Sequence, residues 1–197
     1  MPQALIFATN NQNKVQEIRS VLGNSFQILP LNEANINIDI AEPHNTLQEN
    51  AREKSSIIHK LTGKNCFSED TGLEVNALNG EPGVRSARYA GDTANFKKNI
   101  LKLLKSLNGI QDRTAQFRTV ISLILDNKEY QFEGTCNGYI TTEETGINGF
   151  GYDSVFIPAG STKTFADMEM AEKNIYSHRK KATKKFIDFL KEYYGQN

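Results

Sequence analysis

The sequence lacks the features that mark membrane proteins and proteins that bind nucleic acid in bulk. Lysine plus arginine and aspartate plus glutamate each total 23 of the 197 residues, so the formal net charge is zero. A balanced charge argues against bulk nucleic-acid binding, which needs a basic face. The longest apolar candidate, Val120–Leu125, is interrupted by Ser122 and is far shorter than the roughly 20 residues of a membrane span. We therefore expect neither nucleic acid nor a membrane as a partner.

Signs of secretion and of division into several domains are also lacking. Cys66 and Cys136 are far apart and form no Cys-x-x-Cys pair, so we expect buried, reduced thiols. No basic segment precedes the first short apolar run, so no signal peptide is predicted. No linker, repeat or low-complexity segment divides the chain. With 38% hydrophobic residues, residues 1–197 are predicted to form a single cytoplasmic domain with a substantial core.

The stretch Phe67–Gly91 concentrates the residues best suited to an anionic, metal-bound ligand. A short apolar lead runs into Glu69 and Asp70, which are predicted to lie at the end of a strand. Neighbours in a strand point to opposite faces, so these two carboxylates should not share one role. Carboxylate oxygens suit a hard cation, although a solvated acidic turn is the alternative. Farther on, glycines and a proline shape a loop in which Arg85 and Arg88 are the only charges of residues 83–91.

A candidate anion site lies near the N-terminus. Ala4–Ala8 is predicted to be a buried strand and Thr9–Asn13 a polar turn, and a helix with Val15, Ile18 and Leu22 on one face follows. Lys14 would lie in the first turn of that helix, beside free backbone N–H groups and the positive end of the helix dipole. This arrangement describes an anion cradle, and a plain capped helix is the alternative. The Gly-x-x-x-x-Gly-Lys spacing of a P-loop is absent.

A second helix is predicted from the capping box Thr46-Leu47-Gln48-Glu49 to about Leu61. Lys54 falls on its apolar stripe, which also contains Leu47, Ala51, Ile58 and Leu61. A lysine on an inward face is costly unless it meets an anion, although its stem could instead carry the charge to the rim. The irregular segment before the helix, residues 33–44, supplies Asp39 and Glu42 as spare carboxylates.

The remaining strands and the third helix are read from their residue patterns. Asp92 or Thr93 is expected to cap a helix that stops near Gly109 and whose inward face is Phe96, Ile100, Leu103, Leu104 and Leu107. Predicted strands are Phe26–Leu31, Ala115–Leu125, Glu129–Thr135 and Tyr139–Thr142. Turn signals at residues 126–128 and at Asn137-Gly138 predict that the last three strands form a β-meander.

Two further candidates lie in the C-terminal third. Three glycines around Phe150 and Tyr152 would expose aromatic faces on a loop, which suits stacking on a base, although an ordinary glycine-rich connection is the alternative. Ser177 is predicted to cap the last helix, which places His178 and Arg179 in its first two positions. Cations there oppose the helix dipole, so a functional reason is expected. The inward residues of this helix are Ala182, Phe186, Phe189, Leu190 and Tyr193.

Four segments, in order, resemble the inosine triphosphate pyrophosphatase (Ham1-type) family. They are Ala8-Thr9-Asn10-Asn11-Gln12-Asn13-Lys14, the loop SEDTGLEVNALNGEPGVRSARYAG, Phe150-Gly151-Tyr152-Asp153 and Ser177-His178-Arg179. The resemblance covers nearly the whole chain. It implies an α/β fold with a long twisted mixed β-sheet flanked by helices, two lobes with a nucleotide-binding groove between them, and a homodimer. The implied activity is hydrolysis of non-canonical purine nucleoside triphosphates (ITP, dITP and XTP) to the monophosphate and pyrophosphate.

The resemblance also implies roles for single residues. Glu42 and Asp70 would bind Mg²⁺, with Mn²⁺ possible. Asp70 is the assigned general base, although it could instead orient a metal-bound water. The base would stack on Phe150, and Asp153, His178 and Arg179 would read it. The implied substrate-binding set is Thr9, Asn10, Asn11, Gln12, Asn13, Lys14, Lys54, Thr71, Phe150, Gly151, Tyr152, Asp153, Lys173, His178 and Arg179.

Two positions depart from the family pattern. Asn13 stands where glycine is common, and asparagine tolerates the left-handed region. Glu69 stands where aspartate is usual and is one methylene longer, so the rate or the metal preference could differ. Two other functions stay open at this point. One is a house-cleaning pyrophosphatase of different base preference, acting for example on modified pyrimidines, and the other is a catalytically silent nucleotide-binding protein.

Overall fold

The chain forms two compact units. The structure is a computed structural model that describes residues 4–22 and 26–195. Unit 1 is formed by the described parts of residues 1–70, 119–134 and 179–197, and unit 2 by residues 71–118 and 135–178. Three long strands, β3 (Cys66–Val75), β5 (Thr114–Leu125) and β6 (Lys128–Ile140), pass from one unit into the other.

The described strands form a mixed sheet in the order β2-β1-β3-β5-β6-β7, with β4 pairing β3 off this path. The short strands are β1 (Ala4–Phe7), β2 (Gln27–Pro30), β4 (Pro82–Gly83) and β7 (Phe156–Pro158). In unit 1, β1 pairs with β2 and with β3 in parallel. In unit 2, β4 runs antiparallel to β3, and β7 antiparallel to β6. The predicted mixed α/β sheet flanked by helices is confirmed.

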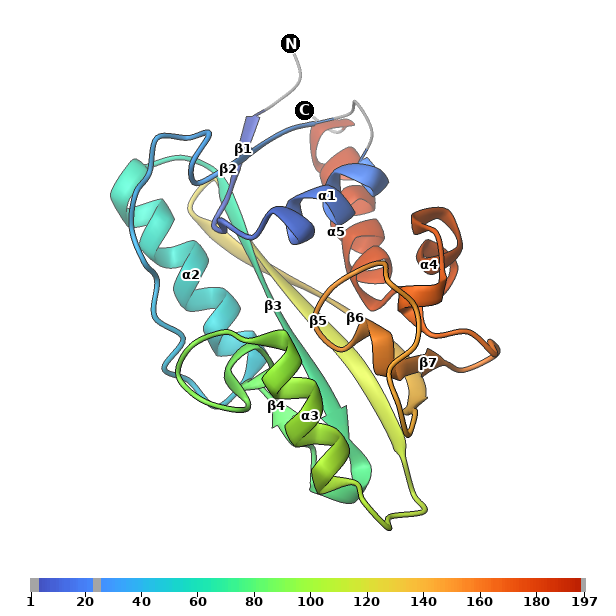
Figure 1. The fold of residues 1–197 in the computed structure, drawn as a ribbon. Coiled ribbons are helices and arrows are strands. Elements are labelled where there is room, and N and C mark those ends of the chain that lie inside the picture. The colour runs from blue at the N-terminus through green and yellow to red at the C-terminus, as the bar shows by residue number, and fades with distance from the viewer. Residues whose placement is uncertain (1–3, 23–25, 196–197) are drawn as a thin grey trace. The chain divides into compact units, whose positions relative to one another are not determined.

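In unit 1, helices lie on both sides of the strands (Figure 1), and alternate strand residues pack with different helices. The helices are α1 (Gln12–Leu22), α2 (Leu47–Thr62) and α5 (His178–Gly195). Leu5 and Phe7 of β1 are buried with the apolar residues of α1 and α5. Ile6, between them in sequence, packs instead with Ile58 of α2. This two-residue period is what a strand buried on both faces requires.

Helix α2 begins and ends close to the predicted residues. The Thr46 hydroxyl oxygen accepts a hydrogen bond from the Glu49 backbone N–H at 3.1 Å, and the hydroxyl donates to the Glu49 carboxylate at 2.8 Å. Gly63 ends the helix in the left-handed conformation, with φ of 66°. Leu61 was expected to face the core, but it is 58% exposed because it lies in the last turn, where no core covers it.

Unit 2 has its own core around α3 (Phe96–Ser106), whose Ile100 and Leu103 are buried. The predicted cap at Asp92 or Thr93 is wrong. Asn95 caps the helix, and its side-chain oxygen accepts a hydrogen bond from the Lys98 N–H. Phe96, expected on the inward face, is the first residue of the helix and is 40% exposed. Leu104, also expected there, is only partly buried. The residue patterns also did not predict β4, β7 and the short helix α4 (Met170–Tyr176), which are too brief to show a clear period.

The predicted turn at Asn137-Gly138 is also wrong, because the single strand β6 runs unbroken through these two residues. The other predicted turn, at residues 126–128, is confirmed, and Asp126 and Asn127 there have φ angles of 50° and 64°. Gly138 serves a different purpose. A Cβ placed on Gly138 would lie 2.2 Å from the carbonyl oxygen of Ile157 in β7. Glycine at this position therefore lets β7 approach β6 closely.

Both predicted buried thiols are confirmed, since Cys66 and Cys136 are free and buried. Burial raises the pKa of the Cys66 thiol to about 12. Among the described helices, none is both long and apolar enough to span a membrane.

We expect Gly138→Ala to lower the free energy of unfolding by about 1–3 kcal/mol, because the added methyl overlaps the backbone of β7. Urea unfolding monitored by circular dichroism measures this change. Gly195→Ala is the matched control, since a Cβ there meets nothing within 4 Å. Equal unfolding midpoints for the two variants would contradict the close approach of β7.

Candidate active site

The two adjacent carboxylates of β3, Glu69 and Asp70, point to opposite faces of the strand. On one face, Ser68 donates a hydrogen bond to the Ala51 carbonyl of α2, and Asp70 pairs with a lysine of the same helix. On the other face, the ring of Phe67 packs against that of Phe186 in α5, with 5.0 Å between the ring centres. Glu69, on this same face, pairs with cations of α1 and α5. The prediction that Glu69 and Asp70 do not share a role fits this arrangement. The strand does not end at them but continues to Val75, because its later residues Leu73 and Glu74 pair with β4.

Lys54 lies between two carboxylates of unit 1. Its Nζ atom is 2.6 Å from Oε1 of Glu42 and 2.8 Å from Oδ1 of Asp70. Lys54 and Asp70 are each 6% exposed, so the lysine meets anions inside the protein and does not extend to the rim. Burial disfavours its ammonium form, but Asp70 and Glu42 outweigh burial and raise the pKa of Lys54. We call Glu42, Lys54 and Asp70 the Lys54 cluster.

The second oxygen of Asp70 is available for a metal ion. Within the described chain, Oδ2 of Asp70 is buried and has no hydrogen-bond partner. Burial raises the pKa of Asp70 above its ordinary range, and Lys54 opposes that shift. No group of three or more metal-ligating side chains occurs among the described residues. A pair of carboxylates suits Mg²⁺ or Mn²⁺, which complete their coordination with water and phosphate oxygens, better than zinc or an all-protein calcium cage.

A second charged cluster surrounds Glu69. Its two oxygens accept hydrogen bonds from Nε and Nη2 of Arg179, at 2.6 and 3.0 Å. Oε1 of Glu69 also lies 3.1 Å from Nζ of Lys14, and Nη1 of Arg179 pairs with Glu17. Burial acts against the carboxylate form, but Arg179 and Lys14 hold the pKa of Glu69 well below its usual range. We call Lys14, Glu17, Glu69 and Arg179 the Arg179 cluster.

Glu17, which is 5% exposed, was not among the residues predicted for the site. The available signal was its position three residues after Lys14, which places the two side chains on neighbouring parts of the helix surface.

The first turn of α1 is capped by its own sequence. Oδ1 of Asn11 accepts hydrogen bonds from the backbone N–H groups of Asn13 and Lys14, at 3.0 and 3.3 Å. Thr9 in turn accepts from the N–H of Asn11 at 3.1 Å. The expectation of free N–H groups beside Lys14 is therefore wrong for these two amides. The side chain of Lys14, 17% exposed, is the group that this turn offers to an anion.

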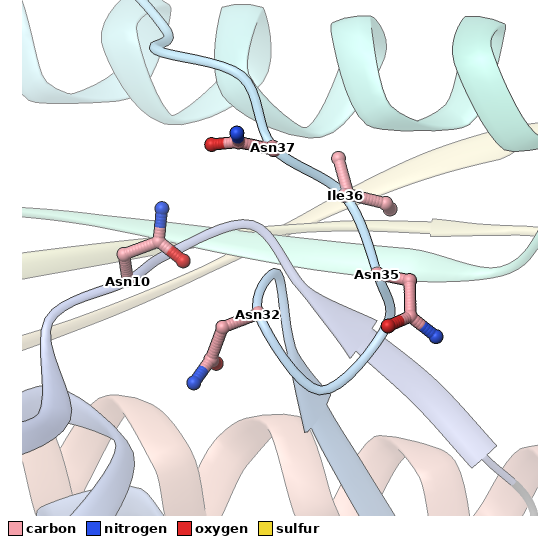
Figure 2. A pocket seen from close by; sticks show the side chains of 5 residues that line it. All are labelled: Asn10, Asn32, Asn35, Ile36 and Asn37. Carbon is pink, nitrogen blue, oxygen red and sulfur yellow. The ribbon is translucent and has the colours of Figure 1, made fainter.

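Asn10 of the same turn lines a separate pocket of about 500 Å³ in unit 1 (Figure 2). The other lining residues, Asn32, Asn35, Ile36 and Asn37, belong to the segment that follows β2. Figure 2 shows Asn10 and Asn37 on one side of this segment, and Asn35 pointing away from them. None of the described residues that line the pocket carries a charge, so phosphate is not the ligand that this lining favours.

In unit 2, a buried ion pair holds the glycine-rich loop. Oδ2 of Asp153 accepts hydrogen bonds from the Phe150 backbone N–H at 2.8 Å and from Nζ of Lys173 at 2.7 Å. A Cβ on Gly149 would lie 2.1 Å from the same oxygen, so the loop needs glycine at that point. The Lys173 ammonium lies 5.5 Å from the centre of the Phe150 ring. The predicted residues Phe150, Asp153 and Lys173 thus lie together.

The two aromatic residues of this loop differ. Phe150 is partly buried and its ring lies 6.1 Å from that of Phe96. Tyr152 was expected to expose a face, but it is 3% exposed and its hydroxyl donates to the Ser86 carbonyl at 2.9 Å. Burial raises the pKa of Tyr152. Its ring belongs to the unit 2 core, so its predicted contact with substrate has no exposed face to support it.

The other predicted residues fall in both units. His178, the first residue of α5, is buried in unit 2 and stacks on Phe117 at 4.6 Å between ring centres. Arg179, the next residue, belongs to unit 1. Gln12 is exposed at the start of α1, Thr71 is partly buried in β3, and Gly151 has φ of 66°.

The mixed sheet and two buried clusters, each of which pairs carboxylates with cations, define the class of this protein: an α/β protein with strongly perturbed ionisable groups, which gather at functional sites. A model of the Ham1 family matches residues 5–189, and the chain belongs to that family.

Similar proteins cover nearly the same length. A dITP/XTP pyrophosphatase of Flavobacterium johnsoniae is 49% identical over 186 residues, which are 94% of this chain and 97% of that protein. The dITP/XTP pyrophosphatase of Porphyromonas gingivalis is 49% identical over 189 residues, 95% of this chain and 97% of that protein. The structure of the Staphylococcus aureus Ham1 protein matches with a TM-score of 0.87 and 38% identity, covering 96% of this chain and 99% of that one.

Removing the buried cation of the Lys54 cluster should be destabilising. We expect Lys54→Met to lower the free energy of unfolding by about 3–5 kcal/mol, because it leaves Glu42 and Asp70 without their shared partner. Lys60→Met, on an exposed position of the same helix, should change stability by less than about 0.5 kcal/mol. Urea denaturation measures both, and equal stabilities would show that the cluster is hydrated and weakly coupled.

Proposed function

We propose that this protein hydrolyses the non-canonical purine nucleoside triphosphates ITP, dITP and XTP to the monophosphate and pyrophosphate. Membership of the Ham1 family and relatives named dITP/XTP pyrophosphatase support this activity. The observation that carries the proposal is the Lys54 cluster, a buried lysine on two carboxylates with an unpartnered Asp70 oxygen among the described residues. A cation for phosphate and oxygens for a metal ion are what cleavage of a phosphoanhydride requires.

In unit 1, the residues would act on the triphosphate. Lys54 and Lys14 would neutralise the charge that develops on the leaving pyrophosphate. Glu42 and Asp70 would hold Mg²⁺, with Mn²⁺ as an alternative. When bound there, the ion would supply Lewis-acid stabilisation of phosphate oxygens and a more acidic water. Asp70 has two candidate roles, accepting a proton from the attacking water or orienting that water as a ligand of the ion.

In unit 2, the residues would act on the base. Phe150 offers a ring for stacking, and its position is set by the hydrogen bond from its backbone N–H to Asp153. His178 would donate to O6 of hypoxanthine or xanthine, where adenine presents a donor of its own. A site built around one such hydrogen bond can reject the analogue lacking it by about 10⁴–10⁵. Arg179 was assigned the same role, and its ion pairs with Glu17 and Glu69 in unit 1 give it a second candidate role at the phosphates.

The homodimer and the cytoplasmic location stay predictions that gel filtration and cell fractionation would test. The two other functions left open by the sequence are not favoured by the names of the relatives. Comparing the turnover of ITP with that of a modified pyrimidine triphosphate separates these two functions from the proposed one. A pyrophosphatase of different base preference would favour the pyrimidine, and a silent binding protein would turn over neither.

We expect the purified protein to convert ITP to IMP and pyrophosphate in Mg²⁺ or Mn²⁺, with no orthophosphate, and to lose activity in EDTA. Asp70→Asn should abolish turnover while the fold stays cooperative, because the variant loses the charge of the proposed metal ligand. Asp39→Asn, an exposed carboxylate of the segment before α2, is the matched control and should keep full activity. Products are separated by ion-exchange chromatography. Full activity in EDTA, or stepwise release of orthophosphate through IDP, would overturn the proposal.

Stacking on Phe150 should be indifferent to base identity. We expect Phe150→Ala to lower kcat/KM for ITP, ATP and GTP by a common factor that corresponds to about 1–3 kcal/mol. Tyr139→Ala, which removes an exposed ring of β6 in the same unit, should leave all three values unchanged. A loss confined to ITP would show instead that Phe150 contributes to selection of the base.

A further inference from the structure

The Arg179 cluster is formally neutral, although it contains the lysine that would meet phosphate. Two carboxylates, Glu17 and Glu69, face two cations, Lys14 and Arg179. Glu17, Glu69 and Arg179 are 5, 3 and 3% exposed, so their charges are poorly screened by water. Burial of this kind makes each charge act strongly on its neighbours.

Glu17 makes this cluster neutral. Glu69 accepts hydrogen bonds from Nε and Nη2 of Arg179 and also pairs with Lys14, so one carboxylate serves two cations. Glu17 takes the remaining side of the guanidinium through Nη1. Without the charge of Glu17, the same cluster would carry one net positive charge beside the phosphate end of the proposed substrate.

We propose that Glu17 is a positioning residue that keeps Arg179 on Glu69 and, by its charge, limits how tightly the site of Lys14 retains pyrophosphate. A product with several negative charges leaves a neutral cluster more readily than a positive one. Glu17 thereby favours product release. The inference rests on the proposed function in taking pyrophosphate as the product.

The test separates charge from shape at one position. Glu17→Gln keeps a side-chain oxygen for Nη1 of Arg179 and removes the charge, whereas Glu17→Asp keeps the charge on a shorter chain. We expect Glu17→Gln to bind inorganic pyrophosphate about tenfold more tightly, as measured by calorimetry, and to show equally stronger product inhibition of ITP turnover. Glu17→Asp should bind pyrophosphate within about twofold of the wild type.

Two further variants control the experiment. Glu33→Gln neutralises an exposed carboxylate that pairs with Arg19, a residue of α1 like Glu17. This variant should leave pyrophosphate binding unchanged. Arg179→Gln changes the cluster charge in the opposite direction, so it should weaken pyrophosphate binding by about tenfold or more. That variant also provides a reading independent of Glu17, should Glu17→Gln fail to fold.

Several outcomes would overturn the inference. Glu17→Gln could bind pyrophosphate no more tightly than the wild type, or Glu33→Gln could tighten it equally. Arg179→Gln could leave pyrophosphate binding intact while changing the ratio of ITP to ATP turnover, which would make Arg179 a reader of the base. Calorimetry requires no turnover. A protein that binds pyrophosphate as expected but fails to hydrolyse ITP would therefore refute the proposed function, while the control of pyrophosphate binding by the charge of Glu17 would stand.

Discussion

Unit 1 depends on the burial of two adjacent carboxylates in one strand. Glu69 and Asp70 point to opposite faces of β3, and each would be strongly unfavourable inside the protein without a cation. Three helices supply the cations: α1 brings Lys14, α2 brings Lys54 and α5 brings Arg179. The apolar alternation of β1 and β3 packs these helices on the sheet, and the charges fix which residue of each helix meets the strand. A core requirement and a chemical site are therefore satisfied by the same contacts.

Unit 2 uses a buried ion pair for a different purpose. Asp153 and Lys173 hold a loop whose glycines would otherwise leave its backbone free to vary. Oδ2 of Asp153 accepts hydrogen bonds from both the Lys173 ammonium and the Phe150 backbone N–H. The Phe150 ring is therefore positioned by an interaction within its own loop. The pair thus gives Phe150 a defined position without a regular strand or helix around it. A ring positioned before ligand binding loses little freedom when a base stacks on it.

Features that depend on neighbouring residues could be predicted from the sequence, whereas features that depend on contacts with distant segments could not. The capping box at Thr46, the period of α1 and the opposite faces of Glu69 and Asp70 follow from a few neighbouring residues, and the structure agrees with them. Asn137-Gly138 was predicted to be a turn, because the actual reason for the glycine, the close approach of β7, is not visible in the local sequence. Tyr152 looked exposed because its partner, the Ser86 carbonyl, is remote in sequence. Site residues were recognised through resemblance to a family, and Glu17 was missed because its partner, Arg179, lies far along the chain.

Charge balance also bears on how ligands enter unit 1. The two carboxylates and one ammonium of the Lys54 cluster leave one net negative charge, which by itself would repel a polyphosphate. A divalent cation added to Glu42 and Asp70 would reverse that sign. The Arg179 cluster is already neutral and cannot supply the missing attraction. In the proposed site, metal and polyphosphate would therefore bind together and strengthen each other. The buried carboxylates, by themselves unfavourable to a polyanion, would make binding of the polyphosphate depend on the metal ion.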